Sequence, residues 1–183
     1  MSAMRSPRAL AVGVLAAGMM SHQPHAQSFG RTPSASEIAG WDIDVRPDGA
    51  GLPAGGGTVA QGRAVYDENC AACHGPEGRD GIRDRLAGGQ GTLASGQPIK
   101  TVGSYWPYAT TLFDYIRRAM PYQAPASLSA DETYAVSAYI LYLNGILPAE
   151  GGLDRASLPR VRMPNRDGFL PEREFTAGWT AAR

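Results

Sequence analysis

Both cysteines of this 183-residue chain lie within a single pentapeptide, and this motif limits what the chain can fold around. It reads Cys70-Ala71-Ala72-Cys73-His74. C-x-x-C-H is the attachment pattern of c-type haem, because two thiols three positions apart can each add to one vinyl group of the same porphyrin. The next residue then places its imidazole under the iron as the proximal ligand. The motif therefore predicts one covalent haem c, with His74 as an iron ligand.

Three other uses of the cysteines are weaker. A closed zinc site needs four ligands, and this motif supplies three. A thioredoxin-like dithiol lies beside a strand at the start of a helix, whereas here the motif ends a helical stretch. A disulfide between Cys70 and Cys73 would close a tight, strained loop and stabilise the fold little. Haem attachment is the favoured interpretation.

The first 26 residues have the composition of a cleaved export signal. Arg5 and Arg8 form a positive region, residues 9–20 form a short apolar core, and Ala26 offers a cleavage position. The apolar run is too short to span a bilayer unaided, although an N-terminal anchor is the alternative. We expect residues 1–26 to be removed and the mature protein, without a membrane span, to be periplasmic. Covalent haem attachment outside the bacterial cytoplasm agrees with this location.

Removal of the signal would change the inventory of charges and ligands. Of 17 basic and 17 acidic residues, Arg5 and Arg8 would be lost, which leaves 15 against 17 and a formal charge of about minus two. This balance does not indicate a nucleic-acid binder. His22 and His25 would also leave, so His74 would be the only histidine of the mature chain.

The rest of the chain divides by composition into one domain and two flanks. Glycine and proline crowd residues 27–57, and proline, arginine and glycine return in residues 148–183, so both are expected to be irregular. Helical periodicity is confined to residues 58–147. A core this small often needs a bound cofactor for stability.

The first predicted helix starts at Val59, capped by Thr58, and runs to the haem motif. Gly62 and Tyr66 lie one turn apart on one face. Glycine in a helix costs about 1 kcal/mol relative to alanine, so Gly62 suggests a close crossing with another helix, unless it is merely tolerated.

Two further helices follow. Thr110 or Thr111 is expected to cap a helix over about Leu112–Ala119, which Pro121 prevents from continuing. Ser129 and Glu132 form a capping box for the last helix, and Asn144-Gly145 supplies its left-handed stop.

The order helix, haem motif, loop, helix, methionine, helix resembles the class I cytochrome c fold over Thr58–Ile146. The resemblance implies an all-α domain around one haem, in which the first and last helices cross and a methionine loop covers the other haem face. Met120 lies where that pattern places the distal ligand. Met163, Lys100 or an open site are the alternatives, and Met120 could instead be a core side chain.

The nature of the distal ligand bears on function. Histidine–methionine ligation raises the reduction potential, and a saturated iron leaves no vacant position for oxygen or peroxide. Electron transfer is then the whole chemistry, and no catalytic residue is expected.

Other haem contacts are less defined. Trp106 and Arg118 are candidate propionate donors, with Tyr105, Tyr108 and Arg117 as further possibilities, and each could equally be an ordinary core or surface residue. Class I proteins often orient the proximal histidine with a proline-flanked carbonyl. Residues 81–86 contain no proline, so no orienting group can be named.

Several stretches outside the haem motif are similar to the cytochrome subunits of molybdenum sulfite dehydrogenases and of the related Sox sulfur dehydrogenase: Trp41–Gly49, Gly88–Leu93, Ser104–Phe113, Arg117–Pro121 and Met163–Phe169. This resemblance implies an electron-transfer subunit that accepts electrons from a molybdopterin partner oxidising sulfite or protein-bound sulfane sulfur. A downstream cytochrome or oxidase would then be the acceptor. Another periplasmic dehydrogenase as donor, or a haem enzyme or sensor with an open site, are the alternatives.

The flanks suggest a second kind of contact. Trp41, Ile43 and Val45 alternate with acidic residues, which predicts a short strand or an extended docking segment. Three aromatic residues of the tail are candidate anchors on a neighbouring protein: Phe169, Phe175 and Trp179. Alternatively, both flanks wrap their own domain.

Overall fold

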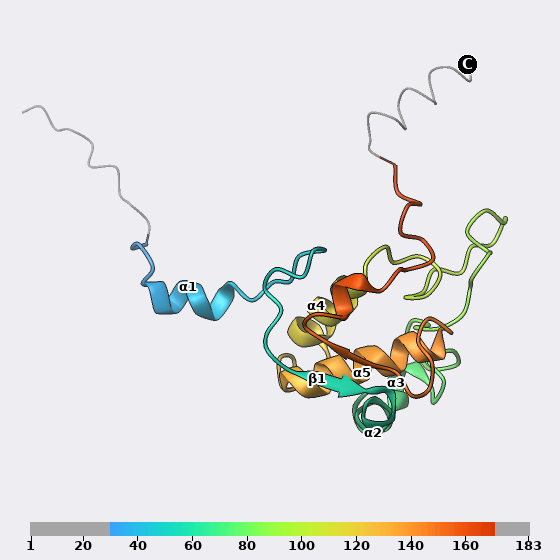
Figure 1. The fold of residues 1–183 in the computed structure, drawn as a ribbon, viewed down its shortest axis with the longest axis horizontal. Helices are drawn as coiled ribbons and strands as arrows, with labels where there is room; N and C mark the ends of the chain where they lie inside the picture. The colour runs from blue at the N-terminus through green and yellow to red at the C-terminus, as the bar shows by residue number, and fades with distance from the viewer. Residues whose placement is uncertain (1–29, 171–183) are drawn as a thin grey trace, which may run out of the picture.

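The computed structural model describes residues 30–170, which form a small helical domain with one helix held away from it (Figure 1). The predicted signal segment, Phe175 and Trp179 lie outside the described residues. The elements in chain order are α1 (Ala35–Trp41), β1 (Gly56–Thr58), α2 (Val59–Asn69), α3 (Ala71–His74), α4 (Ala109–Ala119), α5 (Ala130–Leu143), β2 (Gly152–Asp154) and the 3-10 helix η1 (Leu158–Arg160). Within residues 30–170, no helix has the length and apolarity that crossing a bilayer requires.

The crossing of α2 and α5 forms the centre of the domain. A Cβ on Gly62 would overlap the carbonyl oxygen of Ala135, so the two backbones approach as closely as only glycine allows. One turn later on α2, the fully buried ring of Tyr66 lies 5.2 Å from that of Tyr139, measured between centroids. The predicted close crossing at Gly62 is confirmed.

Most helix ends follow the predicted signals. Thr58 caps α2 in a capping box with Gln61, and Ser129 caps α5 in a capping box with Glu132. Gly145 follows α5 with a φ of 68°, the left-handed conformation expected there.

The start of α4 was predicted incorrectly. The helix begins at Ala109, three residues before the expected position, and Tyr108 at its N-cap makes no capping bond. Thr110 is instead buried, with its hydroxyl 3.5 Å from the carbonyl oxygen of Pro47. Burial of Ala109 in the core extends the helix by a turn without a side-chain cap.

The C-terminal flank is not an irregular tail throughout, because part of it pairs with the start of the domain. Strands β1 and β2 are antiparallel, with Gly57 opposite Leu153. Leu153, Leu158 and Met163 are all buried in the same core as α4 and α5. Up to this point, the flank wraps its own domain.

The N-terminal flank has two parts. Its second part packs on α4: the Val45 amide donates to Asp114 Oδ1 at 2.9 Å, and Arg117 donates to the Ile43 carbonyl at 3.2 Å. Of the two alternatives predicted for this segment, the short strand does not form: Trp41 ends α1, the Ile43 amide donates back to the Trp41 carbonyl at 2.9 Å, and residues 42–46 belong to no strand.

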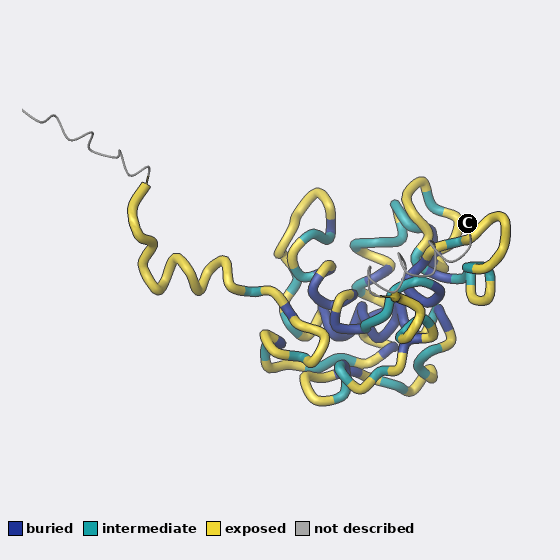
Figure 2. Tube along the Cα trace, turned by 90° about the horizontal axis from the view of Figure 1, so that it is seen from above, coloured by how far each residue is buried: buried dark blue, intermediate teal, exposed yellow. Residues whose placement is uncertain are grey.

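Its first part is the helix α1, which the composition of the flank did not predict. Ser34 and Glu37 form a capping box, a signal that is visible in the sequence. None of the residues of α1 is buried, and both views show the helix projecting from the domain (Figures 1 and 2).

Candidate haem site

The two cysteines lie where α2 gives way to the single turn of α3. Cys70 is the C-cap of α2, and its amide donates to the backbone carbonyl of Tyr66. The Cys70 carbonyl in turn accepts from the His74 amide at 3.0 Å. Both Cys70 and Cys73 are free thiols and partly buried. Burial, with a smaller contribution from Cys73, raises the pKa of the Cys70 thiol to about 11. The motif therefore presents two unpaired thiols on one turn, as attachment to one porphyrin requires.

The imidazole of His74 is oriented by a backbone carbonyl. Its Nδ1 lies 2.8 Å from the carbonyl oxygen of Asp84. A carbonyl only accepts, so Nδ1 carries the proton and Nε2 keeps its lone pair for a metal. This is the orienting group that could not be named from the sequence. Any residue type supplies a carbonyl, so the sequence carries no signal for it.

The loop that presents Asp84 is tied to the haem motif by backbone bonds. The Arg83 amide donates to the Cys73 carbonyl at 2.9 Å, and the Leu86 amide donates to the Gly78 carbonyl at 2.7 Å. A Cβ on Gly81 would overlap the backbone of Cys73 and His74, so this position has room only for glycine. The Asp84 carbonyl is thus held in place relative to His74.

Asn144 braces the same loop from the end of α5. Its side-chain amide donates to the Leu86 carbonyl at 3.0 Å and to the Ile140 carbonyl at 2.9 Å, and its Oδ1 accepts from the Gly88 amide at 3.1 Å. The sequence suggested only a helix stop at this position. A buried amide that joins two segments 56 residues apart in the chain leaves no local pattern to detect.

The Tyr66 side chain also stabilises the backbone directly after the motif. Its hydroxyl donates to the Gly75 carbonyl at 2.8 Å, just after His74. Burial, and then the neighbouring Cys70, raise the pKa of this phenol, so it remains a donor at any ordinary pH. The Tyr66 side chain thus serves both the helix crossing and the motif.

The two methionines have different surroundings. Met120 is the C-cap residue of α4 and lies only partly buried against the core. Met163 is 1% exposed and belongs to the core itself. Lys100 is exposed, with Nζ 5.0 Å from the centre of the Tyr105 ring. Ligation by Met120 stays a prediction, but Met163 already has a packing role.

The candidate propionate donors are partly engaged with protein. The guanidinium of Arg118 forms a bidentate ion pair with Asp114, and this bond raises the pKa of Arg118. Trp106 is half-buried, with its ring edge-on to Tyr115 at 5.8 Å, and its indole N–H has no hydrogen-bond partner among residues 30–170. Arg166 covers the Tyr108 ring at 4.1 Å. Their roles toward a haem stay predictions.

The side chains of the C-x-x-C-H motif suit a haem better than a bare metal ion. In the described part of the chain, no group of three or more His, Cys, Asp and Glu side chains is placed to hold a metal. What the motif offers is two free thiols and one imidazole with a fixed tautomer. In addition, Ser137 Oγ is a buried polar atom without a partner within the described residues, two turns before Asn144 on the same helix.

Comparison with known proteins decides the family. The model for the family described as cytochrome C oxidase, cbb3-type, subunit III matches residues 57–140. One chain of the crystal structure of the sulfane dehydrogenase SoxCD from Paracoccus pantotrophus is 41% identical, and the match has a TM-score of 0.76. It covers 86% of this chain and 78% of that chain. The chain is a class I c-type cytochrome.

The predicted fold class is therefore confirmed, with a small two-stranded sheet added to the helices. As a cytochrome c domain, the protein binds haem c covalently, and its chemistry is the transfer of single electrons. The match to the SoxCD chain extends well beyond residues 57–140, so the likeness includes part of the flanks.

Proposed function

We propose that this cytochrome is a periplasmic electron-transfer subunit that accepts electrons from a molybdopterin-dependent sulfite or sulfane-sulfur dehydrogenase. It passes them to a downstream cytochrome or oxidase. The observation that carries the proposal is the 41% identity to a SoxCD chain over 86% of the residues, flanks included. A match confined to the haem domain would support only a general electron carrier.

The number of haems follows from the cysteines. The chain contains two cysteines, both in the one C-x-x-C-H motif, so we propose a single haem joined to Cys70 and Cys73. A subunit of this kind relays one electron at a time from a donor that oxidises its substrate by two.

The residues around the iron are proposed to set its reduction potential. The Nδ1–H bond to the Asp84 carbonyl makes the His74 ring a more basic ligand, which favours Fe(III). The thioether of Met120, proposed as the sixth ligand, favours Fe(II) and raises the potential. With both residues as ligands, the iron would have no coordination position open to exogenous ligands.

The proposed location rests on residues 1–26, whose charge and apolar pattern are those of an export signal. N-terminal sequencing of the mature protein from the native host tests it, and a mature protein that retains residues 1–26 would contradict it.

The functional test follows the absorbance of reduced haem after addition of sulfite, with and without the molybdenum dehydrogenase from the same source. A protein-bound persulfide replaces sulfite in a parallel series. We expect fast reduction only when substrate and dehydrogenase are both present. If a chemical reductant works but neither substrate does, the protein is still a cytochrome and the proposed donor is wrong.

A further inference from the structure

We propose that the N-terminal arm, residues 31–44, is the docking element for the electron-donating dehydrogenase subunit, with Trp41 as its anchor. This inference rests on the proposed function and names the surface by which the partner is held. The arm comprises α1, the residues before it and the acidic residues that follow it.

The arm exposes apolar side chains that its own domain does not cover. Trp41 is 89% exposed and Ile38 is 50% exposed, on a helix with no buried residue. The helix projects from the domain in two perpendicular views (Figures 1 and 2). Tryptophan is enriched among the residues that dominate binding energy at protein interfaces.

Local bonds hold this helix in the folded form before any partner arrives. The Ser34 amide donates to Glu37 Oε2 at 2.8 Å, and the Glu37 amide donates back to Ser34 Oγ at 3.3 Å. Arg31 forms a bidentate ion pair with Glu37. That pair, with the Ser34 bonds, lowers the pKa of Glu37 to about 2. Preorganisation reduces the entropy that binding must otherwise overcome.

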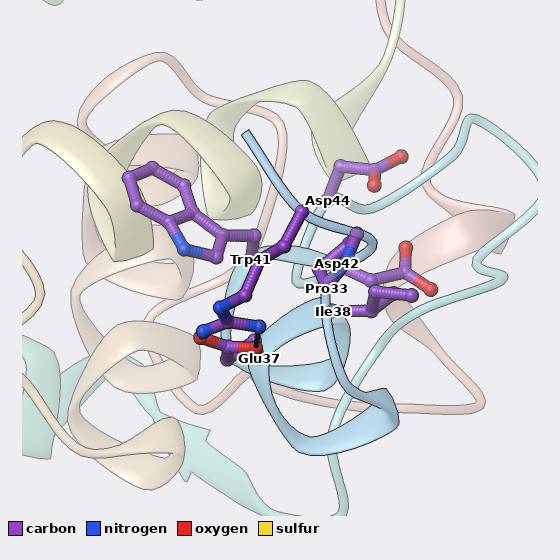
Figure 3. A pocket seen from close by; sticks show the side chains of 7 residues that line it. Pro33, Glu37, Ile38, Trp41, Asp42 and Asp44 are labelled. Atoms are coloured by element: carbon purple, nitrogen blue, oxygen red, sulfur yellow. Dashed lines mark hydrogen bonds and ion pairs between the residues drawn. The ribbon is translucent and has the colours of Figure 1, made fainter. Parts of the chain in front are cut away.

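The surface of the arm has the composition of an interface (Figure 3). A shallow hollow has an apolar part made by Pro33, Ile38 and Trp41, with polar residues around it. Two of these, Asp42 and Asp44, form no salt bridge within residues 30–170. An apolar centre with a charged rim is typical of docking surfaces. The rim is acidic, so the complementary partner presents an apolar pocket flanked by lysine or arginine.

The acidic rim also argues against a second copy of this chain as the occupant. A two-fold dimer through the arm would bring the same patch from each copy together. Asp42 and Asp44 would then face like charges, which disfavours the contact. A different chain with a basic rim meets no such penalty.

The base of the arm is fixed to the haem domain, so a docked partner would be held in a defined position. The Val45 amide donates to the buried carboxylate of Asp114, and Arg117 donates to the Ile43 carbonyl. Asp114 and Arg117 both lie on α4, the helix whose C-cap is Met120. The arm is therefore attached to the haem domain through α4, close to the proposed iron ligand Met120.

The test measures binding of holo-cytochrome variants to the dehydrogenase by calorimetry, together with the rate of substrate-driven haem reduction. Trp41→Ala is expected to weaken binding by about 30-fold or more, as for a hot-spot residue. Its thermal stability and midpoint potential should stay those of the wild type, because Trp41 lies outside the core. The control Tyr142→Ala removes an exposed ring from α5 and is expected to change affinity less than threefold.

A second variant tests the charged rim. Asp42→Asn combined with Asp44→Asn should slow association and flatten its dependence on salt, while dissociation changes little. A salt dependence unchanged from the wild type would contradict a basic partner surface.

The outcomes separate this inference from the proposed function. If the dehydrogenase reduces the wild type and Trp41→Ala equally fast, with equal affinity, the docking inference is wrong and the function stands. If the wild type neither binds the dehydrogenase nor is reduced by it, both fail. If the cytochrome alone is a dimer that Trp41→Ala dissociates, a second copy covers the arm and the inference is overturned.

Discussion

Replacing Asn144 with alanine should destabilise the domain and loosen the loop that orients the proximal histidine. The substitution removes two donated bonds, to the carbonyls of Leu86 and Ile140, and two accepted bonds, from the Gly88 amide and, at 3.4 Å, from the Gln90 side chain. A net hydrogen bond contributes about 1 kcal/mol, and a buried group left without a partner costs about 1–3 kcal/mol. Since Leu86 and Gly88 are only partly buried, water can compensate in part. We expect the free energy of unfolding to fall by about 2–4 kcal/mol.

The assay is denaturant unfolding of the ferric holoprotein, followed by circular dichroism, with the slope m compared between variants. Gln90→Ala is the matched control. Gln90 is exposed, and its side-chain amide donates to the Asn144 carbonyl at 3.1 Å and to Asn144 Oδ1 at a longer 3.4 Å, so its loss should cost less than about 1 kcal/mol. A shift of the midpoint for Asn144→Ala no larger than that of the control would refute the bracing role.

The same variant has a second expected effect, on the haem. The Asp84 carbonyl is held by the loop that Asn144 braces, and it keeps the His74 ring basic by accepting its Nδ1 proton. A looser loop weakens that bond and so stabilises Fe(III) less. The midpoint potential should therefore rise in Asn144→Ala and stay unchanged in Gln90→Ala. A fall in the potential would contradict the proposed chain of contacts.

Three further predictions concern the helix crossing, the methionines and acid stability. Gly62→Ala should lower the free energy of unfolding by about 1–3 kcal/mol through overpacking, despite the better helix propensity of alanine, and an unchanged denaturation midpoint would contradict the close crossing. Met120→Ala should abolish the iron–sulfur charge-transfer band of the ferric protein, whereas Met163→Ala should keep the band and cost about 2–5 kcal/mol of stability; the opposite result would exchange the two roles. Bonds from Ser129 lower the pKa of Glu132, so its contribution to the α5 cap is present above an unfolded pKa of about 4.3 and is lost as the pH falls through the lower folded value. Acid titration of wild type and Glu132→Gln should show a weaker pH dependence in the variant, and identical curves would exclude this contribution.

The parts of the fold that follow from short-range chemistry were predictable. The haem motif, the caps at Thr58 and Ser129 and the stop at Gly145 depend on a few adjacent residues, and the structure has each of them. The crossing at Gly62 was predictable as the favoured of two alternatives, because a glycine inside a helix costs about 1 kcal/mol relative to alanine and so suggests a packing reason. The Ser34–Glu37 capping box was equally visible, but the glycine and proline content of the flank concealed α1.

The parts that depend on tertiary contacts were not predictable. Burial of Ala109 starts α4 without a cap, and the pairing of β1 with β2 brings Leu153 into the core. Met163 is buried for the same reason. At the site, the Asp84 carbonyl and the Asn144 brace act between segments that no sequence spacing relates.

The most direct test of the account is a single-turnover experiment without oxygen. Dehydrogenase that has been reduced by its own substrate is mixed rapidly with the ferric cytochrome, and the reduced-haem absorbance is followed. We predict reduction of one haem per chain, by one electron, at a rate that does not limit turnover. If the haem stays ferric with the reduced dehydrogenase but is reduced at once by dithionite, the central claim of electron transfer from this donor is contradicted.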